Sequence, residues 1–364
     1  MRIFINFYFP KIFLISIIHF TTYGIRYFIQ NNEPKLSNLF LSIFLMFLGE
    51  AFSGFVYFYQ EYIILGKKKN NENNNLFDNS NHKGKLKFIH FMIICCSISD
   101  FIGYYDYTTH YSFKMQKFKY HIYFLNGAFL CFFCVINEHF TLKIQIYRHH
   151  YLGLILIIFI LPIYFFYLLI INNNYDMISF ILIIVISLES RYIESQLYII
   201  EKQLNYKYYI SIYYILFLQG IYGIIFMAIL FIFKQQLNLK IDISFKEYDI
   251  LYLLKVFFIL ILTCIYNLCR LKITEKSRPS NNVIGIFLRG VFLHGINSIN
   301  NPEIWSIDII LSIIFFLLGV LIFCEVIILN FFDLNKFTRN KTSERAIYES
   351  SIISKKYSIA INEI

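Results

Sequence analysis

Apolar runs of about 20 residues recur along this chain, and they constrain its fold more than any other feature. An α-helix needs about 20 mainly apolar residues to cross a bilayer, where backbone polar groups must pair within the segment. Hydrophobic residues make up 58% of the 364 residues and charged residues 15%, whereas soluble domains carry about a quarter charged residues. The sequence therefore predicts an all-α integral membrane protein.

Ten segments are apolar enough to be expected as transmembrane helices, and the fourth and ninth are the weakest of them. The first lacks the small-residue cleavage site of a secretory signal, so we expect it to remain as a helix. The ten expected spans are 4–27, 39–65, 88–105, 120–136, 151–171, 177–200, 208–233, 250–271, 282–297 and 304–332.

The basic residues favour an even number of spans with both termini in the cytoplasm. In this orientation 22 of the 33 Lys and Arg residues fall in cytoplasmic segments and 8 on the opposite side, as the positive-inside rule requires. The net charge of +10 therefore belongs to loops between spans. We expect the lipid bilayer as a partner and no nucleic acid.

Counting the spans divides the chain into two halves of five. The first repeat covers 1–171 and includes a polar loop at 66–87, the second covers 176–332, and 333–364 is an expected cytoplasmic polar tail. An odd number of spans per half inverts the second half, and inverted repeats place a binding site at their interface near the midplane. The expected fold is thus about ten transmembrane helices as a 5+5 inverted repeat.

Polar side chains within the spans are the candidate site, because a charge in hydrocarbon costs on the order of several kcal/mol unless it faces a cavity or a partner. Glu50, Asp100 and Arg289 lie in mid-span without a partner nearby in sequence. Arg191 and Glu194 are three residues apart and can form a structural ion pair. The residues expected to line a central cavity are Glu50, Asp100, Asn126, Glu189, Gln219 and Arg289.

Motifs of enzymes and metal sites are weak or absent in the sequence. Cys131-x-x-Cys134 has the spacing of a zinc or redox motif, but it has no second pair and lies within an expected span, so small apolar filler is the better interpretation. The sequence contains no HExxH, GxSxG, Walker A or GxGxxG motif. We expect no enzyme activity, metal or cofactor; a multipass enzyme using the loop histidines His139, His149 and His150 is a lesser alternative.

Four segments, in their order and spacing, carry a likeness to a known family. Gly49-Glu50 matches a Gly-Glu in that family's second helix, and the segment 99–103 matches a Cys-Asp-x-x-Gly in its third. The stretch 194–223 matches motifs that bridge the sixth and seventh helices, and 325–338 matches the end of the tenth. Together they resemble the drug/metabolite transporter superfamily, in its solute-carrier-35-like and chloroquine-resistance-transporter-like branches.

The resemblance implies a two-repeat fold, alternating access and residence in an internal membrane such as the endomembrane system, Golgi, lysosome or vacuole. We expect a secondary transporter of a small polar or charged organic solute, in which Arg289 attracts an anionic group and a carboxylate carries a coupled proton. The region 114–120 departs from the family's Gln-Met-Leu-Arg-Gly. A non-transporting scaffold or degenerate paralogue of the same fold is therefore the alternative, and a homodimer is left open.

Overall fold

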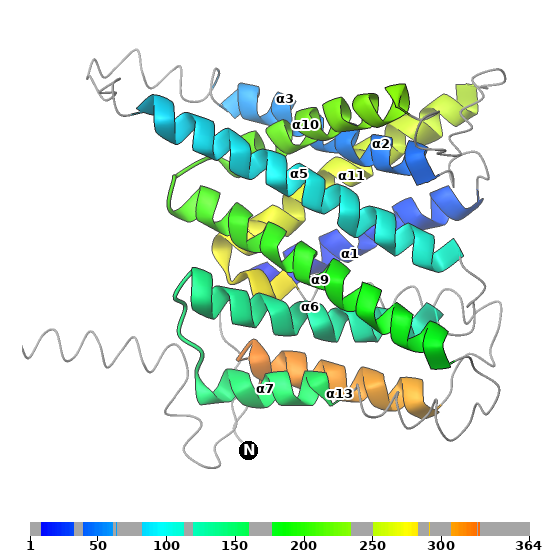
Figure 1. Ribbon diagram of the computed structural model, residues 1–364, viewed down its shortest axis with the longest axis vertical. Helices are drawn as coiled ribbons and strands as arrows, with labels where there is room; N and C mark the ends of the chain where they lie inside the picture. Colours follow the sequence, from blue (N-terminus) through cyan, green and yellow to red (C-terminus); the bar gives the residue numbers. More distant parts are fainter. Residues whose placement is uncertain are drawn as a thin grey trace, which may run out of the picture.

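The computed structural model describes residues 9–32, 39–60, 82–112, 119–159, 177–233, 250–282 and 307–325, and the single positions 63, 291 and 327. Within these ranges the regular elements are helices, and none is a strand (Figure 1). The helices are α1 (Phe9–Asn32), α2 (Leu39–Ala51), α3 (Ser53–Phe58), α5 (His82–Ser112), α6 (Lys119–Thr141), α7 (Arg148–Ile158), α9 (Met177–Tyr206), α10 (Ile212–Ile232), α11 (Ile250–Lys276), the short 3-10 helix η3 (Pro279–Asn281) and α13 (Ile307–Phe323).

Four stretches of described helix are long and apolar enough to cross a membrane: Phe40–Phe58, Leu86–Gly103, Ile212–Ile232 and Ile250–Lys276. A shorter apolar helix, Ile310–Phe323, adds to them. The predicted all-helical class is confirmed, and these helices are compatible with a membrane protein. The expected span at 282–297 lies almost wholly outside the described residues, so the count of ten spans and the 5+5 repeat stay predictions.

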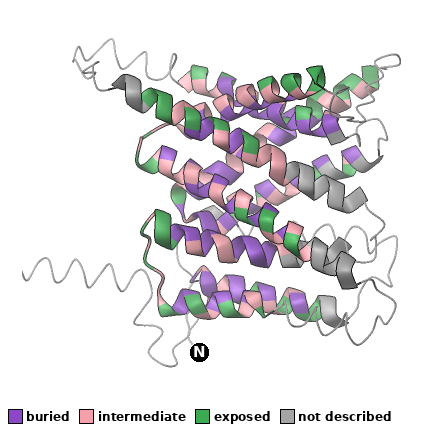
Figure 2. Ribbon diagram, in the orientation of Figure 1, coloured by how far each residue is buried: buried purple, intermediate pink, exposed green. Residues whose placement is uncertain are grey.

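The helices stack in layers that run across the view of Figure 1. Helices α2, α3 and α10 form one side of the stack, and the pair α7–α13 forms the opposite side. Between them α9 packs against both α5 and α6, while α11 packs against α1 and α2. Buried residues concentrate where these layers meet (Figure 2). This arrangement gathers α1, α2, α5, α9 and α11 around the middle of the molecule.

Glycines allow α10 to approach α2 closely. A Cβ atom at Gly220 would overlap the backbone nitrogen of Ala51, and one at Gly223 would overlap the ring of Phe47. Small residues permit this kind of backbone approach between helices in a membrane. Both glycines are therefore packing positions, and neither lines the central cavity.

A second glycine contact joins α7 to α13. A Cβ atom at Gly153 would lie 2.6 Å from the backbone nitrogen of Phe323, and one at Gly319 would lie 2.7 Å from a side-chain carbon of Ile157. The two glycines face each other, since each would also meet the other's carbonyl oxygen. The pair α7–α13 is thus a tightly crossed unit that contacts α6.

The cysteines of the CxxC motif are core residues of α6. Cys131 and Cys134 are both fully buried, the first in a cluster with α7 and α13 and the second beside Leu197 of α9. All seven cysteines are free thiols. The apolar surroundings of Cys131 and Cys134 agree with the interpretation of this pair as small apolar filler.

Short turns at 142–147 and 207–211 lie at one end of the stack, on the left in Figure 1. Lys143 and Tyr209 both have φ of 55°, and each turn closes with a bond from the amide of the next residue to a carbonyl six residues back. In both turns the residue in the left-handed conformation is not glycine, the residue that adopts it most readily. We call this side the basic end, because its turns and helix termini carry Lys143, Arg148, Lys202, Lys207, Lys272, Lys276 and Arg278.

Candidate functional site

A polar cavity of about 70 Å³ lies in the middle of the molecule, between five helices. One water molecule needs about 10–15 Å³ of such space, so the cavity has room for several. Its wall combines guanidinium, carboxylate, amide and phenol groups. The lining residues are Tyr23 and Arg26 of α1, Met46 of α2, Ser99, Asp100 and Gly103 of α5, Arg191, Glu194 and Tyr198 of α9, and Tyr266, Asn267 and Arg270 of α11.

Helical periodicity explains which residues of α9 face the cavity. Arg191, Glu194 and Tyr198 follow one another at intervals of three and four, which places them on one face of the helix. Glu201 continues the same stripe, one turn nearer the basic end. On α11, Asn267 and Arg270 are also three apart and share a face. Two polar stripes therefore face each other across the middle of the bundle.

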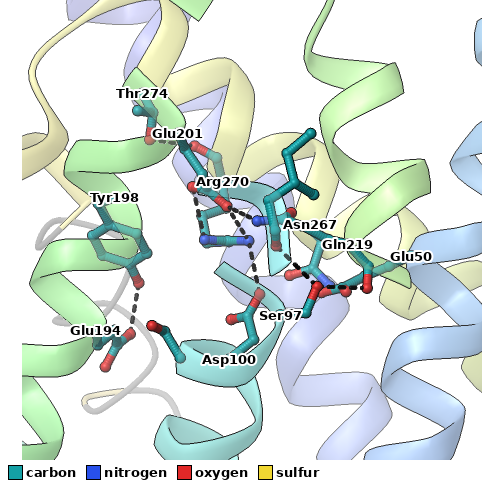
Figure 3. A network of polar contacts seen from close by, with 12 residues as sticks. Glu50, Ser97, Asp100, Glu194, Tyr198, Glu201, Gln219, Asn267, Arg270 and Thr274 are labelled. Carbon is teal, nitrogen blue, oxygen red and sulfur yellow. Dashed lines mark hydrogen bonds and ion pairs between the residues drawn. The ribbon is translucent and has the colours of Figure 1, made fainter. Parts of the chain in front are cut away.

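Arg270 is the centre of the polar network drawn in Figure 3. Its two terminal nitrogens each lie 2.9 Å from one oxygen of Glu201, a bidentate pair. Its Nη2 atom also lies 3.7 Å from Oδ2 of Asp100, and its guanidinium lies 5.4 Å from the ring centre of Tyr198. Since the Arg270 side chain is only 3% exposed, this one cation ties α11 to α9 and α5 in a buried setting.

Gln219 extends the network into α10. Its Nε2 atom donates to Oε1 of Glu201 at 3.1 Å, and its backbone carbonyl accepts a bond from Oγ of Ser97 at 3.0 Å. The Gln219 side chain is fully buried. The amide thus shares Oε1 of Glu201 with Arg270, and the Gln219 carbonyl connects α10 to α5.

Glu50 lies behind the cavity wall, one turn after Met46 on α2. Nδ2 of Asn267 donates to its Oε1 atom at 2.8 Å, and the whole residue is inaccessible to solvent. Because Asn267 lines the cavity, its amide is the link between the cavity and this carboxyl group.

Glu194 is held by two neighbours on its own helix. The hydroxyl of Tyr198 donates to its Oε1 atom at 2.6 Å, and Arg191 pairs with its Oε2 atom. The ion pair predicted from the spacing of three residues is confirmed. The carboxylate of Glu194, the phenol of Tyr198 and the guanidinium of Arg191 thus form one wall of the cavity.

Polar contacts toward the basic end join α9 to the end of α11. The amine of Lys202 donates to the carbonyl oxygens of Thr274, Glu275 and Ser277 at 2.7–2.9 Å, where α11 ends. A lysine on the last carbonyls of a helix also suits the negative end of its dipole. The contact fixes α9 to the C-terminus of α11, beyond the layer formed by Glu201 and Arg270.

Glu138 makes a parallel contact from α6. Its carboxylate accepts bonds from the backbone nitrogen of Ser280 at 2.5 Å and from the hydroxyl of Ser280 at 3.1 Å, so it caps the helix η3. Asn282 then donates to Oγ1 of Thr274 at 2.7 Å. The segment from α11 to η3 is therefore anchored to both α6 and α9 at the basic end.

The structure brings three of the six predicted residues to this site. Asp100 lines the cavity, while Glu50 and Gln219 belong to the network behind its wall. Asn126 is half-buried on α6 and does not line the cavity. Glu189 is exposed on α9 and also lies outside the cavity wall. Arg289 lies outside the described residues.

The main residues absent from that prediction are Arg26, Tyr198, Glu201, Asn267 and Arg270. Charge counting assigned Arg26 and Arg270 to loops, because each stands near the end of an apolar run. Both are 2–3% exposed within α1 and α11. The stripe of three- and four-residue spacings that ends at Glu201 is the signal that could have found this face of α9.

Among the described residues, no group of three or more His, Cys, Asp and Glu side chains could hold a metal ion. No protein-family model matches the chain, and no curated protein matches its sequence. The chemistry of the cavity is therefore the basis for a functional assignment.

Proposed function

We propose that this protein is a secondary transporter that moves a small polar or charged organic solute across a membrane by alternating access. The observation that carries the proposal is the cavity with charged and aromatic lining residues between five helices, of which α2, α5 and α11 contain stretches long and apolar enough to span a bilayer. Ionisable groups at membrane depth are costly unless they serve a cavity or a pathway. A wall with three arginines and two carboxylates is the environment that a charged or zwitterionic solute needs.

The aromatic part of the wall supports the same solute class. Tyr23, Tyr198 and Tyr266 contribute ring faces and hydroxyl groups from three helices. Binding sites for small molecules commonly combine aromatic surface with a few well-placed polar groups. A solute with an apolar part and at least one charged group would meet both kinds of contact here.

The position of the cavity supports alternating access. Its lining residues come from α1, α2 and α5 of the expected first repeat and from α9 and α11 of the second. A site between two inverted repeats can open to either side when the repeats rock against each other. The contacts of Lys202 and Glu138 near the basic end would keep that side closed in this conformation.

The full proposal is a protein of ten transmembrane helices in two inverted repeats, with both termini cytoplasmic, in an internal membrane of the cell. The basic end then faces the cytoplasm, in keeping with the positive-inside rule. The cavity would be closed toward the cytoplasm in this conformation.

Filling the cavity tests the transport proposal. A Cβ atom at Gly103 would meet nothing within 4 Å, so a larger side chain can enter the cavity there without displacing backbone. We expect Gly103→Leu to abolish saturable uptake of the solute into proteoliposomes, with Gly103→Ala as the matched small substitution that retains it. The screen would cover nucleotide sugars, amino acids, peptides and cationic drugs, and thermal unfolding would verify that both variants fold.

A non-transporting membrane scaffold is the second candidate. The observation that favours it is the pairing of buried charges, Arg270 with Glu201 and Arg191 with Glu194, which also suits a permanently closed bundle. Folded wild-type protein that takes up no solute of any class, with or without a pH gradient, would establish the scaffold and refute transport.

A further inference from the structure

Among the described residues, the ionisable groups around the cavity do not balance in charge. They comprise the residues that line the cavity and those hydrogen-bonded to the lining. If all were ionised, the negative charges would exceed the positive charges by one. The groups are the carboxyls of Glu50, Asp100, Glu194 and Glu201 and the guanidiniums of Arg26, Arg191 and Arg270.

An uncompensated charge in such a place is unfavourable, because the effective dielectric constant within a protein is low. Arginine retains its proton under these conditions. The imbalance is therefore relieved most simply if one of the four carboxyl groups binds a proton. The hydrogen bonds identify which one.

Three of the carboxyl groups have a cationic partner. Asp100 lies near Arg270, Glu201 forms the bidentate pair with it, and Glu194 pairs with Arg191. Each therefore has a neighbouring cation that favours its ionised form. Glu50 has no such ion pair among the described residues, so it is the strongest candidate to bind the proton.

Glu50 is the one of the four with no ion pair to either oxygen atom among the described residues. Oδ2 of Asp100 also lacks a hydrogen bond, but it lies 3.7 Å from Nη2 of Arg270. Oε1 of Glu50 accepts only the neutral amide of Asn267, and no described residue forms an ion pair with Glu50. Oε2 is buried and has no hydrogen-bond partner among the described residues. A buried carboxylate oxygen left in this way is costly. A protonated carboxyl group would remove the charge and supply a donor.

The charged surroundings of Glu50 come from four packed helices. Asp100 of α5 and Glu201 of α9 repel a negative charge there, whereas Arg270 of α11 and Arg26 of α1 attract it. Both of the repelling carboxylates already share Arg270. The thiol of Cys264 on α11 also interacts with Glu50. This setting opposes ionisation of Glu50 for as long as Asp100 and Glu201 are themselves ionised.

We propose that Glu50 is a proton-binding site, and that release of its proton toward the cavity, past the amide of Asn267, couples solute movement to a pH gradient. The coupling rests on the proposed transport function, whereas proton binding by Glu50 does not. In the step, the O–H bond of the carboxyl group breaks, the proton passes to water in the cavity, and the carboxylate keeps the electron pair. No redox partner or covalent intermediate is needed.

Infrared difference spectroscopy tests proton binding without any solute. The purified wild-type protein should show the carbonyl band of a protonated carboxylic acid that disappears as the pH is raised. Glu50→Gln should lack this band, and Glu275→Gln, the same change at a half-buried carboxylate paired with Lys272, should retain it. A band that survives unchanged in Glu50→Gln would overturn the assignment.

Transport assays test the coupling separately. One coupled proton and a gradient of one pH unit should give up to about tenfold accumulation of solute in wild-type and Glu275→Gln proteoliposomes, with the gradient imposed in each direction in turn. Glu50→Gln should lose this accumulation but retain solute exchange at equal pH. Accumulation by Glu50→Gln equal to that of the wild type would refute coupling through Glu50. Absence of uptake by the wild type would instead refute the transport function, and the infrared result would still decide the proton site.

Discussion

Arg270 shows how a single side chain can determine the interior of a helical bundle. It pairs with Glu201 in a bidentate geometry and also lies near Asp100, so three helices depend on one guanidinium. Taking such a pair out of water costs several kcal/mol per ion as an order of magnitude, and the attraction between the partners only offsets this cost. The pair therefore specifies how the helices are arranged more than it adds to net stability.

Removing one partner of the Arg270–Glu201 pair should destabilise the protein much more than removing both partners. We expect Arg270→Met to lower the free energy of unfolding by about 3–5 kcal/mol, since it leaves Glu201 buried without its cation. The double variant Arg270→Met with Glu201→Gln should recover a large part of this loss. Chemical unfolding in detergent of the two single variants and the double variant measures the coupling, and additive losses would contradict it.

Sequence could indicate these residues only in part. Glu50, Asp100 and Gln219 stand out because each interrupts a long apolar run. Arg270 and Glu201 are 69 positions apart, so their pairing is a tertiary fact that no local pattern contains. Glu189 was chosen because it is charged and within a span, but at 3.6 residues per turn it lies about 120° around α9 from Glu201. Glu189 is therefore on a helix that lines the cavity, but on a face of that helix that points away from it.

At the scale of helices, the turns of the basic end use residues that are poorly suited to their backbone conformation. Tyr209 lies in the turn after α9 with φ of 55°, a conformation in which glycine is the usual residue. Its side chain is 89% exposed, so packing does not compensate. A left-handed conformation costs an L-residue with a Cβ atom roughly 1–2 kcal/mol.

Replacing Tyr209 by glycine should therefore stabilise the protein. We expect a gain of up to about 1 kcal/mol, because the relief of backbone strain exceeds the added entropy of the unfolded chain. Tyr206→Gly is the matched control: that tyrosine is also exposed but ends a helix, so the substitution should cost about 1 kcal/mol. Melting temperatures in detergent should shift in opposite directions, and a loss of stability in Tyr209→Gly would argue against strain at this turn.

The helices themselves were the most predictable part of the fold. Apolar runs give their positions, yet charged ends made several runs look shorter than the helices they form. Helix α9 continues to Tyr206 and α11 to Lys276, past the expected ends at 200 and 271. The extensions carry Glu201, which accepts from Arg270, and Lys202, which donates to the carbonyl of Thr274, so these polar groups pair between α9 and α11. Such partners are invisible to a criterion based on hydropathy.

For the whole molecule, the layered bundle requires that opposite ends of a spanning helix be exposed on opposite sides of a membrane. Helix α10 is flanked by Tyr209 at the basic end and Phe233 at the other, and both side chains are exposed. In sealed vesicles, a membrane-impermeant thiol reagent should label Tyr209→Cys from one side and Phe233→Cys only from the other. The wild-type protein, with its seven native cysteines, provides the background. Labelling of both positions from the same side would refute the span.

The close crossing of α7 and α13 has a consequence for how this protein can change over generations. The main described contacts of this pair with the rest of the bundle are to α6, its ends also meet Arg278 and Asn281, and neither helix lines the cavity. Substitutions along its outer surface are therefore insulated from the residues that would recognise a solute. Gly153 and Gly319 are the exception, because any side chain there would separate the two helices. Natural sequence variation on the outer surfaces of α7 and α13 should therefore be broad, with Gly153 and Gly319 unchanged. The layer containing Arg270 should tolerate only changes that preserve its charge pairing.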